Sequence, residues 1–131
     1  ILSKSNFKNI LEELVKSQQE TYSLDCKLIY DETINEIVPE IKMNVYRIIQ
    51  EAFNNINKYA NATKVMLFLD FDSAGFLYLE IYDNGSGFNT KKVKEGIGLK
   101  NMKSRTETIK GELHIESEKN KGTRITLKVK L

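Results

Sequence analysis

The sequence predicts an α+β fold, a two-layer α/β sandwich in which a mixed, mostly antiparallel sheet carries helices on one face. Two runs, 76–83 and 124–131, alternate apolar and polar side chains, as strands with one covered and one wet face do. The stretch 39–59 repeats apolar residues at spacings of three and four, which is typical of an amphipathic helix. With 131 residues, the chain is large enough for one core but not for two. Helices packed on one side of a half-wet sheet satisfy these patterns.

The N-terminal part of the chain predicts a helix followed by a short strand. Residues 6–18 repeat one apolar face, so we expect an amphipathic helix that packs either on its own domain or on a neighbour outside the chain. Residues 27–30 are a short strand. Pro39 marks the start of the long helix, because its fixed φ and missing N–H cost nothing in a first turn. The face of the first helix is formed by Phe7, Ile10, Leu11, Leu14 and Gln18.

The C-terminal part predicts four strands and one helix. Residues 72–75 have the composition of a hairpin turn between strands at 64–71 and 76–83. A helix carrying Met102 is expected to stop near Gly111, because glycine is common just after a helix end. The last two strands are expected at 112–116 and 124–131.

Composition excludes several classes of function. The formal charge of +2 is too small to predict a nucleic-acid partner. No run approaches the roughly 18 apolar residues of a membrane span, so we expect no membrane contact. The single cysteine, Cys26, excludes an internal disulfide and a cysteine-based zinc site. Because the chain begins with Ile1, we expect it to be a piece of a longer protein.

Three polar residues share one side of the long helix, beside its apolar stripe. Glu51, Asn55 and Lys58 fall within roughly 60° of one another at ~100° per residue. A carboxylate and a carboxamide oxygen that project together suit magnesium, which takes one or two protein oxygens and leaves its other positions to water and phosphate. The alternative interpretation is a solvated pair on a helix surface.

The glycines of the chain predict a nucleotide site when they are taken with Asp83. That carboxylate ends a strand on its apolar face, where it needs a donor such as the amino group of adenine. Gly85 and Gly87 allow backbone angles closed to other residues and close approach of a ligand. Gly96 and Gly98 open a helix whose free N–H groups favour phosphate, although a turn is the usual explanation for one such pair.

The order of these motifs resembles the ATP-binding module of sensor histidine kinases, within the wider group of gyrase, heat-shock chaperone, kinase and mismatch-repair ATPases (GHKL). The likeness covers about residues 25–131 and implies a Bergerat-type fold. The run from Arg47 to Lys58 looks like the kinase subfamily that signals to helix-turn-helix response regulators. The matching segments are 46–62, Asp83 to Gly87, Gly96 to Met102, and Gly122 with Thr123.

The resemblance assigns a role to each candidate residue of the long helix. It implies that Asn55 is the magnesium ligand, while Glu51 supports polar chemistry or water near the phosphates, with a metal contact as an option. Lys58 would contact phosphate or ribose. Tyr59 would contact the nucleotide, although the family usually has histidine at this place.

The resemblance also assigns the two ends of the nucleotide. Asp83 would accept from the adenine amino group, and Thr123 would help to hold the adenine side. Segment 88–97 would be a short lid, whose lysines are either a phosphate screen or part of a solvated loop. The glycines and apolar residues fall into two sets, Gly85 and Gly87 at the adenine end and Gly96, Ile97, Gly98 and Leu99 at the phosphate end.

Two departures from the family pattern lie outside the nucleotide motifs. Ser104 stands where related kinases often have glutamate before Arg105. The only histidine, His114, falls in a strand-like run rather than on a helix beside an acidic residue. The resemblance therefore implies that the phosphoacceptor histidine lies outside this chain.

The resemblance implies the ATP-binding catalytic domain of a two-component protein-histidine kinase, with ATP and Mg²⁺ as cofactors. Residues 21–131 would form this domain, and 1–20 an N-terminal helix that is one candidate for the trailing end of the dimerisation region. Its partners would be its own histidine-bearing dimerisation domain and a response regulator, with a monomeric isolated domain and a homodimeric kinase. We expect a cytoplasmic location, either free or below a membrane anchor. The alternative is a nucleotide-dependent regulatory module, similar to anti-sigma-factor kinases or to domains that bind ATP without transferring it.

Overall fold

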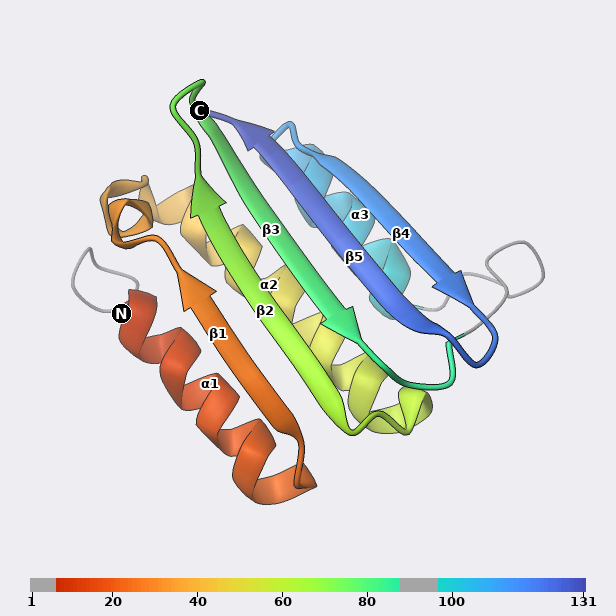
Figure 1. Ribbon diagram of the computed structural model, residues 1–131. Helices are drawn as coiled ribbons and strands as arrows, with labels where there is room; N and C mark the ends of the chain where they lie inside the picture. The colour runs from red at the N-terminus through yellow and green to blue at the C-terminus, as the bar shows by residue number, and fades with distance from the viewer. Residues whose placement is uncertain (1–6, 88–96) are drawn as a thin grey trace.

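The computed structural model describes residues 7–87 and 97–131, and within these residues it contains one five-stranded sheet and three α-helices (Figure 1). The helices lie on one face of the sheet, which confirms the predicted two-layer α+β sandwich. The elements are α1 (Phe7–Tyr22), β1 (Asp25–Tyr30), η1 (Glu32–Glu36), α2 (Pro39–Asn55), η2 (Ile56–Ala60), β2 (Lys64–Phe71), β3 (Phe76–Asp83), α3 (Ile97–Thr108), β4 (Glu112–Glu118) and β5 (Gly122–Lys130).

The sheet is mixed, in the order β1-β2-β3-β5-β4. β1 pairs with β2 in parallel, and the remaining pairs are antiparallel, as the sequence predicted. The register places Asp83, the last residue of β3, opposite both Val65 of β2 and Thr123 of β5. The end of the central strand is therefore flanked on both sides by neighbouring backbone.

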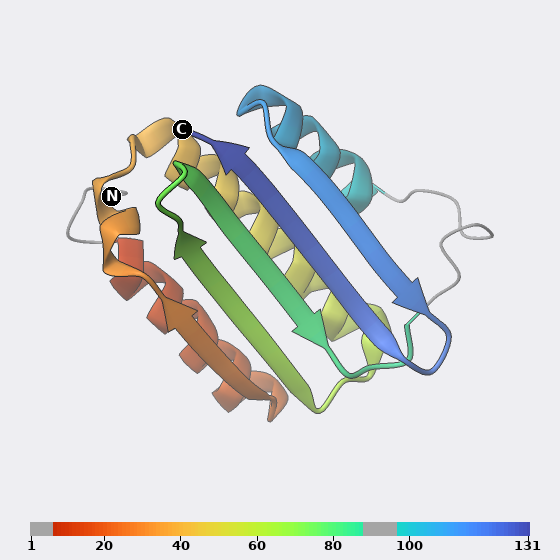
Figure 2. The same ribbon diagram turned by 45° about the horizontal axis from the view of Figure 1, so that its top comes forward.

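The core lies between the sheet and the helices. Along β3 the buried residues alternate with half-buried ones, so that Leu77, Leu79, Ile81 and Asp83 share the covered face. This is the face that the alternation in the sequence predicted for Asp83. Seen from the second direction, α1 lies behind β1 and α2 lies behind the centre of the sheet (Figure 2).

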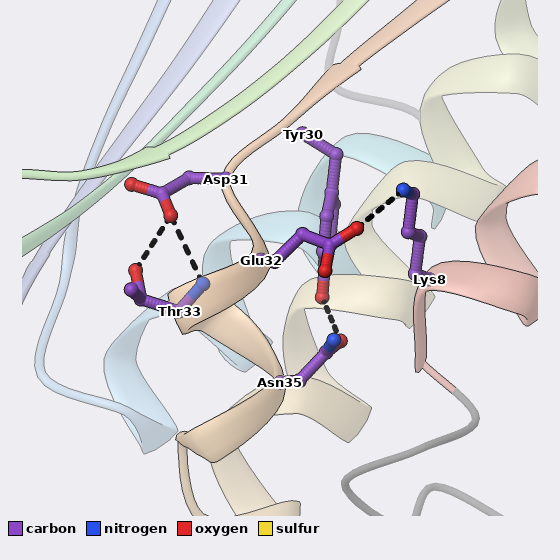
Figure 3. A network of polar contacts seen from close by, with 6 residues as sticks. All are labelled: Lys8, Tyr30, Asp31, Glu32, Thr33 and Asn35. Atoms are coloured by element: carbon purple, nitrogen blue, oxygen red, sulfur yellow. Dashed lines mark hydrogen bonds and ion pairs between the residues drawn. The ribbon is translucent and has the colours of Figure 1, made fainter.

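Helix α1 packs on its own domain, which decides between the two interpretations of its apolar face. The Lys8 ammonium is 2.7 Å from the Glu32 carboxylate in η1, as Figure 3 shows. The ring centroids of Phe7 and Tyr30 are 6.2 Å apart, and the Lys42 ammonium lies 5.9 Å from the Phe7 ring centroid. The helix is thus joined to β1, η1 and α2.

The extent and buried face of α1 differ from the prediction in two details. The helix continues to Tyr22 rather than ending at residue 18. Val15 is buried and was not on the predicted face, whereas Ile10 and Leu14 are only partly buried.

The long helix changes its hydrogen-bonding pattern near its end. The α-helix stops at Asn55 and continues as a single π-helical turn through Ala60, whereas the sequence predicted one regular helix to residue 59. The turn is closed by Asn61 in the left-handed conformation, with φ 51°. π-helical turns often occur at functional sites.

The left-handed residue that follows α3 is Lys110, not Gly111 as the sequence predicted. Lys110, with φ 55°, takes the left-handed position, while the Gly111 amide donates to the Thr106 carbonyl at 2.9 Å. Gly111 is needed for close packing instead, since a Cβ there would lie 3.1 Å from the side chains of Leu127 and Val129.

Candidate nucleotide-binding site

Two clusters of predicted site residues lie at one end of the molecule. The C-terminal ends of α2 and β3 and the N-terminal end of β5 meet there (Figure 1). One cluster is made by side chains where α2 packs on α3. The other is made by backbone and one carboxylate where β3 and β5 end.

In the helical cluster, Gly98 faces Glu51 and Asn55. A Cβ built on Gly98 would lie 3.0 Å from Glu51 Oε2 and 3.3 Å from Asn55 Oδ1. The absence of a side chain at Gly98 thus leaves space for both oxygens beside the first turn of α3. Because the first N–H groups of a helix have no partner within it and carry a partial positive charge, this turn suits a phosphate group.

Asn101 joins this cluster, although the sequence analysis assigned it no role in the site. Its Nδ2 donates to Glu51 Oε1 at 3.4 Å. Asn101 follows Gly98 by three residues in α3, so the two share one face of the helix. That spacing is the signal that would have predicted its position.

Asp83 is the buried carboxylate of the strand cluster. Only 3% of its surface is exposed, and burial raises the pKa of its carboxyl group above the ordinary value. Backbone N–H groups of Gly85 and Thr123 donate to the carboxylate and partly offset the effect of burial on its pKa, with the Gly85 nitrogen 2.8 Å from Oδ1. The carboxylate therefore already has two donors, and an adenine amino group would be a further one.

The glycines around Asp83 bring three backbone segments together. Gly87 has φ +60°, and a Cβ there would lie 2.0 Å from the Glu118 carbonyl oxygen. Gly122 has φ +85°, and its Cβ would lie 2.1 Å from the Asp83 carbonyl oxygen. Gly85 has no positive φ, so its role is the N–H that it donates, not the backbone freedom that the sequence suggested.

Asn84 fixes the strand end to the segment that follows the π-helical turn. Its Oδ1 accepts from the backbone nitrogens of Thr63 and Lys64, each at 2.9 Å. Its Nδ2 donates to the Thr63 hydroxyl at 2.9 Å. Sequence reasoning missed this residue, because its partners lie about 20 positions away in the chain.

Thr123 is half-buried beside Asp83. Its hydroxyl lies 2.8 Å from that of Ser117 across the β4–β5 pair. Its backbone N–H is one of the two donors to Asp83. The structure therefore places Thr123 at the predicted end of the site.

For the remaining predicted site residues, the structure gives the element or the burial but, among the residues that it describes, no contact within the two clusters. Leu99 is half-buried against the core, and Lys58 is exposed within η2, where the helical step of ~100° no longer holds. The place of Lys58 beside Asn55 stays a prediction. Tyr59 lies in η2 and Ile97 begins α3, but their side chains are outside the described residues, as are Gly96 and segment 88–96.

The donor set of the helical cluster fits magnesium better than a metal held by protein alone. Within residues 7–87 and 97–131, no group of three or more His, Cys, Asp or Glu side chains could hold a metal ion. Magnesium needs only one or two protein oxygens when phosphate and water complete its octahedron. Glu51 and Asn55 offer such oxygens in the space that Gly98 leaves open.

Comparison with known proteins shows which family the chain is similar to. A family described as "Histidine kinase-, DNA gyrase B-, and HSP90-like ATPase" matches residues 40–131. The sensor protein VraS of Staphylococcus haemolyticus is 40% identical over 106 residues, which cover 80% of this chain and 30% of that protein. The chain thus spans less than a third of the length of this relative.

Solved structures share the fold at low sequence identity. The histidine kinase domain of a blue-light activated kinase from Erythrobacter litoralis has a TM-score of 0.79 and 14% identity, covering 95% of this chain and 61% of that one. The histidine kinase AdeS of Acinetobacter baumannii has a TM-score of 0.70 and 20% identity, covering 95% and 64%.

The length and apolar character of the described helices bear on whether any of them could span a membrane. None of them is both long enough and apolar enough to cross a membrane.

The family match extends over more than half of the chain and includes every described residue of the two clusters. This chain belongs to the histidine kinase-, DNA gyrase B- and HSP90-like ATPase family.

Proposed function

We propose that this chain is the ATP-binding catalytic domain of a sensor histidine kinase, which presents the γ-phosphoryl group of ATP to a histidine on a separate dimerisation domain. The proposal is supported by a single arrangement, the oxygens of Glu51 and Asn55 against Gly98 where α3 begins. Asp83 lies buried at the strand cluster, where a base with an amino group is the matching ligand. Catalysis in this scheme is positioning and charge neutralisation.

In this proposal, different residues of the chain bind the adenine end and the phosphate end of the nucleotide. Asp83 accepts a hydrogen bond from the adenine amino group and so sets the orientation of the base. The N–H groups of the first turn of α3 and the Lys58 ammonium bind phosphate oxygens. Asn55, with Glu51 beside it, holds Mg²⁺, which when bound neutralises charge on the phosphates.

The acceptor histidine belongs to another domain in this proposal. His114 is exposed on β4, where it pairs with Thr126 across the sheet and points away from the helices. Phosphoryl transfer within the chain would need a histidine near Asn55. A histidine-bearing dimerisation domain is therefore the expected partner, with a response regulator downstream, a homodimeric kinase and a cytoplasmic location for this domain.

Nucleotide binding is the first part of the test. Calorimetric titration with Mg-ATP should show binding, and Asn55→Ala should abolish most of the difference between titrations with and without magnesium. Replacing the amide removes an oxygen ligand but leaves the adenine end intact. Absence of heat and of a thermal shift at millimolar nucleotide, with folded protein, would contradict the proposal.

Phosphoryl transfer is the second part. The chain alone should incorporate no acid-labile label from radiolabelled ATP, whereas a supplied histidine-bearing dimerisation domain should become labelled. Label on His114 would show that the acceptor has been assigned wrongly. Binding of Mg-ATP without transfer to the supplied domain would favour the regulatory module over the kinase.

A further inference from the structure

A polar pocket of about 300 Å³ is lined by side chains of the helix layer. It lies where α1, α2 and α3 face one another. Leu14 and Phe53 contribute apolar surface, and Gln18, Arg47 and Arg105 contribute polar groups. Glu51 borders both this pocket and the proposed phosphate end.

Gln18 is a buried amide that the described structure leaves incompletely paired. The residue is 6% exposed, and its Oε1 is buried without a hydrogen-bond partner. Such a group costs free energy unless something else pairs with it. Since the oxygen and nitrogen of an amide exchange places by a half-turn, Gln18 can offer the pocket either an acceptor or a donor.

Two arginines border the same pocket without a carboxylate partner among the described residues. Arg47 Nη1 donates to Gln50 Oε1 at 3.0 Å, and Arg105 Nη1 donates to Asn44 Oδ1 at 3.4 Å. Both acceptors are neutral amides, so each guanidinium keeps further N–H groups, and the lining carries two positive charges against the one negative charge of Glu51. A carboxylate is the planar anion that arginine binds with two parallel hydrogen bonds.

The positions of the arginines relate the pocket to the phosphate end. Arg47 precedes Glu51 by four residues on α2, and Arg105 follows Asn101 by four residues on α3. One helical turn rises about 5.4 Å. A side chain bound between the arginines would therefore lie about one turn from Glu51, which borders the proposed phosphate end.

We infer that this pocket binds a carboxylate side chain of the histidine-bearing dimerisation domain and so positions the acceptor histidine at the phosphate end. The inference rests on the proposed function, because it needs an acceptor domain. Arg47 and Arg105 bind the carboxylate oxygens, and the Gln18 amide turns its nitrogen toward them. The three residues are positioning residues and do not touch the nucleotide.

The test measures transfer from Mg-ATP, bound to this chain, to the supplied dimerisation domain at several concentrations of that domain. The double variant Arg47→Gln with Arg105→Gln should raise the KM for the dimerisation domain about ten-fold, with unchanged ATP affinity and kcat. The double variant Lys128→Gln with Lys130→Gln is the charge-matched control, because both lysines are exposed on β5 and lie over the Phe76 ring on the open face of the sheet. It should leave this KM unchanged.

Gln18→Leu separates binding from a purely structural role. It removes the unpaired buried amide, so the thermal midpoint of the chain alone should rise, while the KM for the dimerisation domain should also rise. A higher midpoint with an unchanged KM, or an arginine double variant that transfers like the lysine double variant, would overturn the inference and leave the proposed kinase intact. Bound Mg-ATP without any transfer by the unaltered chain would overturn both.

Discussion

The two ends of the candidate site are formed by different parts of the protein: backbone segments at the strand end and side chains at the helical end. At the strand end, Gly87 and Gly122 bring backbone segments so close that any Cβ would meet a carbonyl oxygen at about 2 Å. At the helical end, the nearest described atoms to a Cβ on Gly98 would be side-chain atoms of Glu51 and Asn55, at 3.0 Å or more. The geometry of the strand end is determined by the register of the sheet, and that of the helical end by side chains that can rotate.

This difference indicates which end tolerates change. The backbone clash at Gly122 is relieved only by moving β3 or β5, and such a movement disturbs the ladder that holds Asp83. A clash with Glu51 is relieved by turning its side chain. Substitutions at the strand end should therefore alter stability first, whereas those at the helical end should alter magnesium and phosphate binding first.

The largest effect is expected for Gly122→Ala. The alanine methyl would be forced against the Asp83 carbonyl at a φ of +85°, which L-residues rarely adopt. The free energy of unfolding should fall by about 3 kcal/mol or more. Urea or thermal unfolding of the two proteins measures this difference.

Gly98→Ala is the matched control for that substitution. The same added methyl should change the free energy of unfolding by less than about 1 kcal/mol, because Glu51 can turn away and alanine favours helix. Its affinity for Mg-ATP should nevertheless fall. Equal losses of stability for the two variants would contradict the distinction between the ends.

A smaller effect is expected for Asp83→Asn, and it should appear in base preference. The substitution replaces an acceptor oxygen by an amide, which leaves the adenine amino group mispaired at a cost of ~1–3 kcal/mol in binding. Calorimetry with ATP and GTP should show that the preference for ATP is lost. Asn55→Ala is the control, since it should keep this preference; unchanged affinities in Asp83→Asn would refute the adenine assignment.

The sequence predicted the parts of the fold that follow from periodicity. Alternation along β3 placed Asp83 on the covered face, and the spacing of Glu51 and Asn55 placed them on one side of α2. Both are local properties of a regular strand or helix. The order of the motifs along the chain then predicted the family.

The sequence did not predict features that depend on contacts between distant segments. The π-helical turn at η2 has no periodic signal, and it breaks the ~100° step per residue from which the sequence placed Lys58 beside Asn55. Asn84 and Asn101 join the two clusters through hydrogen bonds to residues that are far away in the chain. Lys110 rather than Gly111 is left-handed, and Gly111 packs closely against the β5 side chains of Leu127 and Val129, contacts that lie far away in the sequence.

The smallest effect is a pH dependence caused by Asp83. Burial raises its pKa, so the folded chain binds this proton more readily than the unfolded chain does. Asp83 alone should therefore make the nucleotide-free chain more stable as pH falls through its folded-state pKa, levelling off below the ordinary value of ~3.9.

Binding of ATP should respond with the opposite sign over the same pH range. A protonated Asp83 carboxyl group is a poorer acceptor for the adenine amino group, so affinity should weaken as pH falls through the raised pKa. Calorimetric titrations of the unaltered chain and of Asp83→Asn at each pH separate this effect from ionisation of the phosphates, which both proteins share. Parallel pH profiles for the two proteins would show that the strand end binds the base without using this carboxylate.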